Sequence, residues 1–250
     1  MFQMPRSRVT LLIILGASLL CGLSLRAAPE DSLYARLLKA YVAEDGVRYA
    51  AWGKQPADVV ALKVFVAELG QSDIDKLSKN EQKALYINLY NAAMLQAVLE
   101  HYPIKSVKQI GLLPFSVFKK KFIPLGDDVV SLDTVEKGIL LKQYFDPRIH
   151  FAVNCASGSC PPLRAEPFVG ERLEAQLHEQ TRLFAQSDRA ARVNSKRKET
   201  AYSELFKWYA DDFGVKNPAD FLNRYRRSKL PTNHSVNWID YDWSLNASQK

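Results

Sequence analysis

The longest periodic pattern in the sequence runs from Ser78 to Pro103 and predicts the longest helix of the chain. Ser78 and Glu81 have the S-x-x-E spacing of a capping box, in which each side chain bonds the backbone N–H of the other residue. Apolar residues then recur at helical spacing until Pro103, which cannot continue a helix. The sequence therefore predicts a fold in which helices dominate.

Shorter helical patterns occupy much of the remaining chain. We expect helices at 32–43, 59–69, 131–141, 171–184, 202–213 and 218–226. Short strands are expected around the turn at 126–128, at 149–153 as one buried strand, and at 236–241 as a closing strand, whereas the basic segment 188–198 is expected to be a solvated loop. Because these strands do not alternate with helices as in βαβ units, we predict an α+β fold, a mainly helical single domain with a small β-sheet.

The N-terminus has the pattern of a secretory signal peptide. Two arginines precede seventeen uncharged residues, Val9 to Leu25, and small residues follow at Ala27 and Ala28. We expect residues 1–28 to be a signal peptide and 29–250 to be the globular domain, periplasmic or secreted, without a stable membrane span. An uncleaved anchor is the alternative, since seventeen residues reach the lower edge of a spanning length. Lipidation at Cys21 is disfavoured because Leu20 precedes it.

The charge of the chain gives little reason to expect a nucleic-acid partner. The formal net charge is +7, but removal of 1–28 leaves 31 basic and 27 acidic residues, a net charge of about +4. The sequence also lacks a glycine-rich phosphate loop, H-E-x-x-H and G-x-S-x-G, the motifs of nucleotide-binding proteins, zincins and α/β-hydrolases. We therefore expect a partner that is a small molecule or a component of the cell envelope, and no nucleic acid.

The segment HFAVNCASGSCPPL, from His150 to Leu163, holds both cysteines of the expected mature protein. Small and polar residues here follow the expected strand, a place where sites are often built. A cysteine nucleophile needs a base beside it and a third group that orients the base. Cys155, His150 and Asn88 supply these types. An extended chain would send His150 and Cys155 to opposite faces, so His150 reaches Cys155 only if the chain turns back at Asn154.

Other interpretations of the same residues stay open. In an oxidising compartment Cys155 and Cys160 could form a disulfide that shapes the loop, or lie as inert buried thiols. If His150 is not the base, His101, His178 or His234 must be. Zinc binding by His150 and the two cysteines lacks a clear fourth ligand, so we expect no metal and no cofactor.

Five ordered segments resemble the Domain of Unknown Function 547 family. They are KALYINLYNAAMLQAVLEHYP (83–103), SLDTVEKGIL (131–140), HFAVNCASGSCPPL (150–163), ELFKWYADDFG (204–214) and IDYDWSLN (239–246). The resemblance spans about residues 72–246 and implies an exported or envelope-associated bacterial protein with a single compact domain, but no particular reaction. Its blocks contain the following candidate residues: Asn88, Tyr90, Asn91, Glu136, His150, Cys155, Cys160, Pro161, Trp208, Tyr209, Asp212 and Asp242.

Polar residues within these blocks are the remaining candidates for a site. Asn88 and Asn91 lie on one face of the long helix, and we expect them to face the 150–162 loop, as a polar wall or as partners of its buried backbone. Glu136 is either a carboxylate partner of a histidine or a charge on a helix surface. We expect Asn91 and Tyr90 to contribute to binding, together with these residues near the cysteines: Ser157, Ser159 and Asp242.

Two functions follow from these candidates. The first is a cysteine-dependent hydrolase or transferase acting on an amide, ester or thioester, with Cys155 as the nucleophile, His150 as the base, and Asn88 or Glu136 as the orienting group. The second is a non-catalytic periplasmic binding or structural module in which a Cys155–Cys160 disulfide holds the loop.

Overall fold

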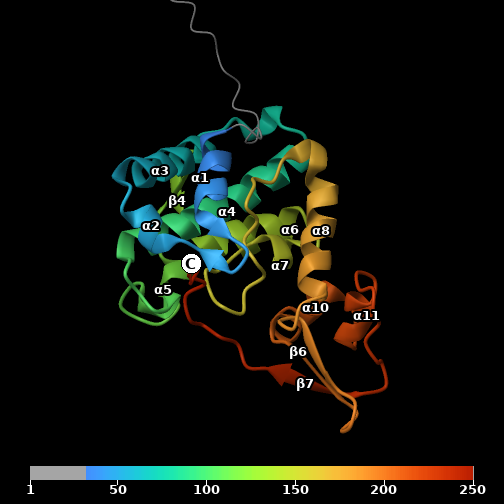
Figure 1. Cartoon of the computed structure of the whole chain (residues 1–250). Helices are drawn as coiled ribbons and strands as arrows, with labels where there is room; N and C mark the ends of the chain where they lie inside the picture. The colour runs from blue at the N-terminus through green and yellow to red at the C-terminus, as the bar shows by residue number, and fades with distance from the viewer. Residues whose placement is uncertain (1–31, 250) are drawn as a thin grey trace, which may run out of the picture.

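The computed structural model of the protein describes residues 32–249. The expected signal peptide, the alternative anchor and Cys21 lie outside these residues. Within them helices predominate and the strands form small separate sheets, so the predicted mainly helical α+β class is confirmed (Figure 1). No helix among residues 32–249 combines the length and the hydropathy that a membrane span requires.

The long helix α4, Lys79–His101, forms the centre of the fold. Its predicted capping box is present, because Ser78 N–H donates to Glu81 Oε2 at 2.8 Å and Glu81 N–H donates to Ser78 Oγ at 3.3 Å. The helix is buried on nearly all sides from Gln82 to Leu99. A helix that is apolar around most of its circumference must be covered by other elements. Other elements cover α4 in this way.

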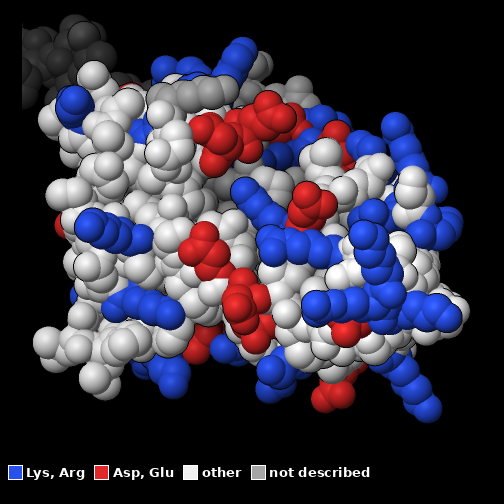
Figure 2. Space-filling view, turned by 60° about the horizontal axis from the view of Figure 1, so that its bottom comes forward, with Lys and Arg blue, Asp and Glu red and all other residues white. Residues whose placement is uncertain are grey.

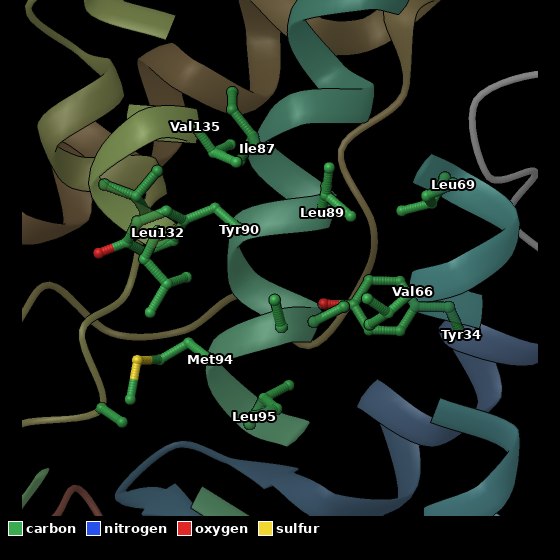
Figure 3. Close-up of a cluster of buried hydrophobic side chains, with 14 of the residues drawn as sticks. Tyr34, Val66, Leu69, Ile87, Leu89, Tyr90, Met94, Leu95, Leu132 and Val135 are labelled. Carbon is green, nitrogen blue, oxygen red and sulfur yellow. The ribbon is translucent and has the colours of Figure 1, made fainter. Parts of the chain in front are cut away.

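Two groups of elements cover α4 from opposite sides. On one side α1 (Leu33–Tyr41), α2 (Tyr49–Gly53) and α3 (Pro56–Gly70) pack, with Tyr34, Val66 and Leu69 pointing toward α4 (Figure 3). On the other side Leu132 and Val135 approach from the helical segment that contains the π-helix η3 (Thr134–Leu140), which continues as α6 (Leu141–Gln143) (Figure 3). The predicted N-cap at Ser131 is present, since its Oγ accepts a hydrogen bond from Thr134 N–H.

The first two sheets are antiparallel hairpins. One joins β1 (Val42–Ala43) to β2 (Gly46–Val47), and the other joins β3 (Ile123–Leu125) to β4 (Asp128–Val130), where two strands were predicted around residues 126–128. Short helical turns connect these elements to the rest of the fold: η1 (Ile74–Lys76), η2 (Val107–Gln109) and α5 (Ser116–Lys119).

The third sheet differs from the sequence-based expectation. The basic segment predicted as a loop forms a hairpin of β5 (Ala191–Asn194) and β6 (Glu199–Ser203), and β7 (Ser235–Ile239) adds to β6 in parallel. Strand β5 is an edge strand with Arg192, Val193 and Asn194 exposed, so its short run of apolar and polar residues gives no periodic signal. The closing strand itself was predicted correctly.

The helices of the C-terminal half are shorter than predicted. After η4 (Gly170–Arg172), α8 (Leu173–Ala185) matches the expected helix, but the helix predicted at 202–213 begins only after β6. It consists of α9 (Leu205–Trp208) and α10 (Ala210–Phe213), and α11 (Pro218–Leu222) follows.

The buried strand predicted at 149–153 is wrong: this segment is a one-turn helix, α7 (Ile149–Ala152). Its side chains are shared between two hydrophobic clusters. Ile149 and Ala152 belong to the large cluster around α4, whereas Phe151 packs with Phe184 and Phe206 in a smaller C-terminal cluster. A continuous apolar run is compatible with a buried helix or a buried strand. Here the segment packs against both hydrophobic clusters, and it does so as a helix. The segment after α7 therefore starts at the seam between the clusters.

Candidate functional site

A cavity of about 420 Å³ lies at this seam. One part of its wall comes from α4 and η3, and another from α9 and the C-terminal segment. Aromatic rings supply most of the apolar wall: Phe115, Phe118, Trp208, Tyr209, Tyr241 and Trp243. Cys155, His150 and Glu136 contribute polar groups to the same wall. The cavity therefore combines an apolar space with a thiol, an imidazole and a carboxyl group.

Hydrogen bonds within the loop and close packing on the C-terminal segment fix the shape of the loop that carries Cys155. Asn154 fixes its turn, because its Nδ2 donates to Pro161 O at 2.7 Å and its Oδ1 accepts from Ala156 N–H at 2.9 Å. Ala156 has a left-handed backbone with φ 58°, an uncommon conformation for a residue with a Cβ atom. Gly158 lies so close to the C-terminal segment that a Cβ atom there would stand 2.6 Å from Asp242 Oδ2. These contacts give the loop a defined backbone conformation.

Three groups surround the half-buried sulfur of Cys155. Its Sγ lies 2.9 Å from Cys160 Sγ, 3.1 Å from Ser157 Oγ and 3.3 Å from Tyr241 Oη. Burial acts to raise the pKa of the Cys155 thiol, but hydrogen bonds from Cys160, Ser157 and Tyr241 outweigh burial and lower this pKa to about 7. Burial and the neighbouring Cys155 sulfur raise the pKa of Cys160 well above its ordinary value. At neutral pH the proton of the pair therefore stays on Cys160.

The two cysteines are free thiols in this structure. Their sulfur separation of 2.9 Å exceeds the roughly 2.05 Å of a covalent S–S bond. The Cys155 N–H also donates to Cys160 Sγ at 3.0 Å. The predicted disulfide is thus not found here, although the loop brings the two sulfurs into contact.

His150 is buried and paired with a carboxylate. Its Nε2 lies 2.8 Å from Asp212 Oδ2, and its ring packs on Tyr209 with ring centroids 4.0 Å apart. Burial lowers the pKa of His150, against the opposing influence of the Asp212 carboxylate, so the imidazole is neutral at pH 7. Because Nε2 is held by Asp212, Nδ1 is the nitrogen left for proton transfer on a ring that lines the cavity. The turn that α7 makes removes the objection that an extended chain would separate His150 from Cys155.

Glu136 takes neither of the two roles predicted for it. It is buried, and its Oε1 accepts a hydrogen bond from Tyr209 Oη at 3.0 Å. Burial raises the pKa of Glu136, while hydrogen bonds from Tyr209 and Tyr90 act in the opposite direction. The carboxylate that contacts the histidine belongs to Asp212. Glu136 therefore orders the tyrosines of the wall, and Tyr90 also lines the cavity.

The two asparagines of α4 have different partners. Asn91 faces the loop as predicted, because its Nδ2 donates to Ala152 O and its Oδ1 accepts from Asn154 N–H. The same prediction for Asn88 is wrong: its amide bonds both N–H and C=O of Phe168, at 2.9 and 2.7 Å. Asn88 does not line the cavity, and the geometry gives it no contact with His150 from which to orient that ring.

The remaining predicted binding residues hold the loop against the C-terminal segment. Ser157 Oγ lies 3.2 Å from Tyr241 Oη, and Ser159 Oγ accepts from Asp242 N–H at 2.8 Å. Asp242 in turn accepts from Ser244 N–H, and hydrogen bonding to Ser244 lowers the pKa of the Asp242 carboxyl group. Ser159 and Asp242 do not line the large cavity, whereas Ser157 reaches it indirectly through Cys155 and Tyr241.

The sequence assigns no role to two residues of the site: Asp212 is a candidate only through the family resemblance, and Tyr241 is not a candidate. Asp212 and Tyr241 lie 62 and 86 positions from the residues they contact, His150 and Cys155, so no local spacing reveals the pairs. Their membership in blocks resembling the family was the available signal. Among the histidines of the described chain, His150 is the one that lines the cavity. Residues 32–249 contain no cluster of three or more His, Cys, Asp or Glu side chains that could hold a metal ion.

The fold and site thus define a mainly helical α+β protein in which a thiol and the histidine of a histidine–aspartate pair line one apolar cavity. In a comparison with known proteins, residues 74–185 match the family model described as "Protein of unknown function, DUF547", which confirms the resemblance over this part of the chain. No curated protein and no solved structure matches the chain significantly. The matched part contains Glu136, His150, Cys155 and Cys160, whereas Asp212 and Tyr241 lie beyond it.

Proposed function

We propose that this is an exported bacterial protein, periplasmic or secreted, that acts as a cysteine-dependent hydrolase or transferase on an amide, ester or thioester. The observation that carries the proposal is the meeting of Cys155 and the His150–Asp212 pair on one cavity. A nucleophile, a base and a group that orients the base are the three parts that this class of catalysis requires. Asp212 replaces Asn88 and Glu136 as the orienting group.

The chemistry follows from the protonation states of these groups. With a pKa of about 7, Cys155 is partly thiolate at neutral pH, and the neutral imidazole of His150 can accept the proton of the remaining thiol. The Cys155 sulfur attacks the acyl carbon, so a C–S bond forms. The bond from carbon to the leaving group breaks, and the leaving group takes the proton from His150. Water or another acceptor then forms a new bond to the acyl carbon, the C–S bond breaks, and the thiol is restored.

The apolar lining supports an acyl group of some size. Phe118, Val153 and Leu205 add to the aromatic part of the wall, and the cavity volume suits a ligand of small-molecule size. Asp133 and Lys137 in the lining are paired with each other at 2.9 Å. The wall is therefore mainly apolar and suits an apolar acyl chain, with Lys119 as a cation in the lining that no ion pair in the described part of the chain neutralises.

An acyl-transfer assay tests this proposal. The protein is mixed with p-nitrophenyl esters and phenyl thioesters of increasing acyl length, and an acyl adduct on Cys155 is sought by mass spectrometry together with release of the leaving group. We expect the adduct in the parent and its loss in Cys155→Ala. Asp212→Asn should slow turnover, whereas Asp211→Asn, an exposed neighbour on the same helical turn, should not. Turnover retained in Cys155→Ala would refute the proposal.

The non-catalytic module remains a second candidate because the sulfurs of Cys155 and Cys160 are already in contact at 2.9 Å. Loss of two protons and two electrons to an oxidant of the cell envelope would join them. The bond would occupy the proposed nucleophile and leave the cavity as a binding site. Intact-mass measurement of protein from the native compartment, with and without reductant, separates the two candidates: a complete disulfide favours the binding module.

A further inference from the structure

An apolar tip projects from the surface beside the cavity. It consists of Leu112, Leu113, Pro114 and Phe115, between η2 and α5, and Leu112 is fully exposed while Leu113 is 70% exposed. Two neighbouring leucines displayed to water are unfavourable unless something covers them, and adjacent exposed apolar residues often mark an interaction surface.

The tip is held in this position by the structure around it. Gly111 has a φ of 92°, and a Cβ atom at this position would stand 2.2 Å from Ser116 Oγ. Ser116 Oγ donates to Ile110 O at 3.0 Å, which closes the turn. Phe115 adopts a left-handed backbone and packs its ring edge-on against Trp243, with centroids 4.6 Å apart. The leucines therefore stand on a turn of defined shape.

Lysines flank the tip on both sides in the sequence, with no acidic residue between them. The segment 104–122 contains five lysines and no aspartate or glutamate. Lys108 lies over the rings of Phe115 and Trp243, at 5.2 and 5.4 Å from their centroids, and exposed Lys119, Lys120 and Lys121 follow the tip after the single turn of α5. The ion pairs found within residues 32–249 do not include these four lysines, so their charge is available to a partner.

We propose that the apolar tip and these lysines dock the protein on the surface of a lipid bilayer that contains anionic lipids. The leucines would enter the interface between headgroups and acyl chains, and the lysines would contact the anionic headgroups, a combination typical of peripheral membrane binding. Figure 2 shows basic side chains in many places on one face with acidic side chains between them, so positive charge does not form one continuous patch there. The apolar tip distinguishes the lysines at 108–121 from the other basic side chains.

This docking has a consequence for the cavity, although it does not depend on the proposed reaction. Phe115 and Lys119 belong to the docking surface and also line the cavity. A docked molecule would therefore hold one edge of the cavity at the bilayer, where apolar acyl chains are available.

Photo-crosslinking in the full chain tests the proposal. A benzophenone amino acid replaces Leu113 or, as the control, Val64, which is 45% exposed on α3. Each protein is irradiated with vesicles of phosphatidylcholine alone or mixed with phosphatidylglycerol, and peptides bearing a lipid adduct are measured by mass spectrometry. The apolar run 9–25 is present in both proteins, so it contributes equally to both.

We expect lipid adducts at position 113 on the mixed vesicles, far above those at position 64. Lys120→Gln and Lys121→Gln should each weaken vesicle binding, measured by the adduct yield at limiting lipid, by about fivefold, since a lysine near an anionic surface contributes about that factor. Equal labelling at positions 113 and 64 would overturn the proposal and favour a protein as the partner of the tip. Labelling that is unaffected by phosphatidylglycerol and by both lysine substitutions would also overturn it, because charge would then play no part.

Discussion

At the scale of single residues, the environment of Cys155 is the decisive feature. Its sulfur is surrounded by hydroxyl and thiol groups, and two of these come from its own loop while Tyr241 comes from the C-terminal segment. Hydrogen bonds favour the thiolate, whereas burial favours the neutral thiol. The hydrogen bonds have the larger effect, so the pKa of Cys155 is lowered. Cys160, only five residues away, has the opposite balance. The sequence alone does not distinguish the two cysteines, whereas their surroundings in the fold shift their pKa values in opposite directions.

Removing the hydroxyl of Tyr241 should shift this balance. Tyr241→Phe deletes a hydrogen bond to Cys155 Sγ, so the pKa of the thiol should rise above about 7, toward the ordinary value near 8.5. A rise of one unit would reduce the thiolate fraction at pH 7 from about a half to about a tenth. Alkylation rates of Cys155 as a function of pH measure this change. An unchanged midpoint would show that Tyr241 does not stabilise the thiolate.

Asn88 and Asn91 form a matched pair for mutagenesis, because both are buried on α4 and each bonds two backbone groups. Replacing either by Leu should cost about 1 to 3 kcal/mol of unfolding free energy, since buried backbone groups lose their partners. Only Asn91→Leu should also alter the reactivity of Cys155, because only Asn91 bonds the loop. Thermal or denaturant unfolding measures the first effect, and alkylation measures the second. Equal effects of both substitutions on Cys155 would contradict the assignment.

At the scale of secondary-structure elements, the sequence predicts what is local and misses what depends on packing. The helix α4, its capping box and the hairpin around residues 126–128 carry their own caps, periodicity and turn residues, and all are present as predicted. The prediction of a strand at 149–153 is wrong because a short, nearly continuous apolar run has no periodicity by which a strand can be told from a helix. The β5–β6 hairpin is not predicted, because the exposed strand β5 and the basic turn 196–198 together resemble a loop.

The same limit applies to the candidate site. Cys155, His150 and Glu136 were recognised as site residues from one segment and from the family resemblance, and all three line the cavity. Their partners were not recognised, because Asp212 reaches His150 only when the C-terminal cluster packs on α7. The contact between Glu136 and Tyr209 likewise joins residues 73 positions apart.

The helical segment with η3 carries a prediction about pH. Burial raises the pKa of Glu136 above its unfolded value near 4.3, so the folded state binds a proton more tightly than the unfolded chain. The stabilisation from this group is fully present below the unfolded pKa and is lost as the pH rises through the folded pKa. Glu136→Gln should remove this part of the pH dependence and lose less stability than the parent on going from pH 4 to pH 7. Unfolding free energies of both proteins between these pH values test it; parallel curves would contradict it.

At the scale of the whole molecule, the C-terminal segment joins parts that are distant in sequence. It runs back from β7 past the cavity to the N-terminal hairpin (Figure 1), where Val47 N–H donates to Asn246 O and Ser248 N–H donates to Val47 O. On the way, Asn246 N–H donates to Ala156 O and Gly158 N–H donates to Ser244 O. The cavity is therefore completed by the last element of the chain, and the two hydrophobic clusters meet around it.

Export is a prediction about the whole molecule that rests on residues 1–28. We expect the mature protein to begin within a few residues of Ala28 and to be found in the soluble periplasmic or secreted fraction, because a basic start and an apolar run precede small residues. N-terminal sequencing of protein from that fraction tests this expectation. Recovery of the chain with Met1 intact, in membranes only, would indicate an anchor instead.

If Cys155 is an activated nucleophile, the pH dependence of its alkylation rate will show it. With reductant removed immediately before the measurement, iodoacetamide should modify Cys155 with a midpoint near pH 7, and Cys160 should react slowly. His178→Ala, on an exposed part of α8, serves as the control for His150→Ala when the rates are compared with acyl turnover. His150→Ala should abolish turnover, whereas His178→Ala should not. A Cys155 that titrates near pH 8.5, or that the native protein keeps blocked in a disulfide with Cys160, would contradict the account.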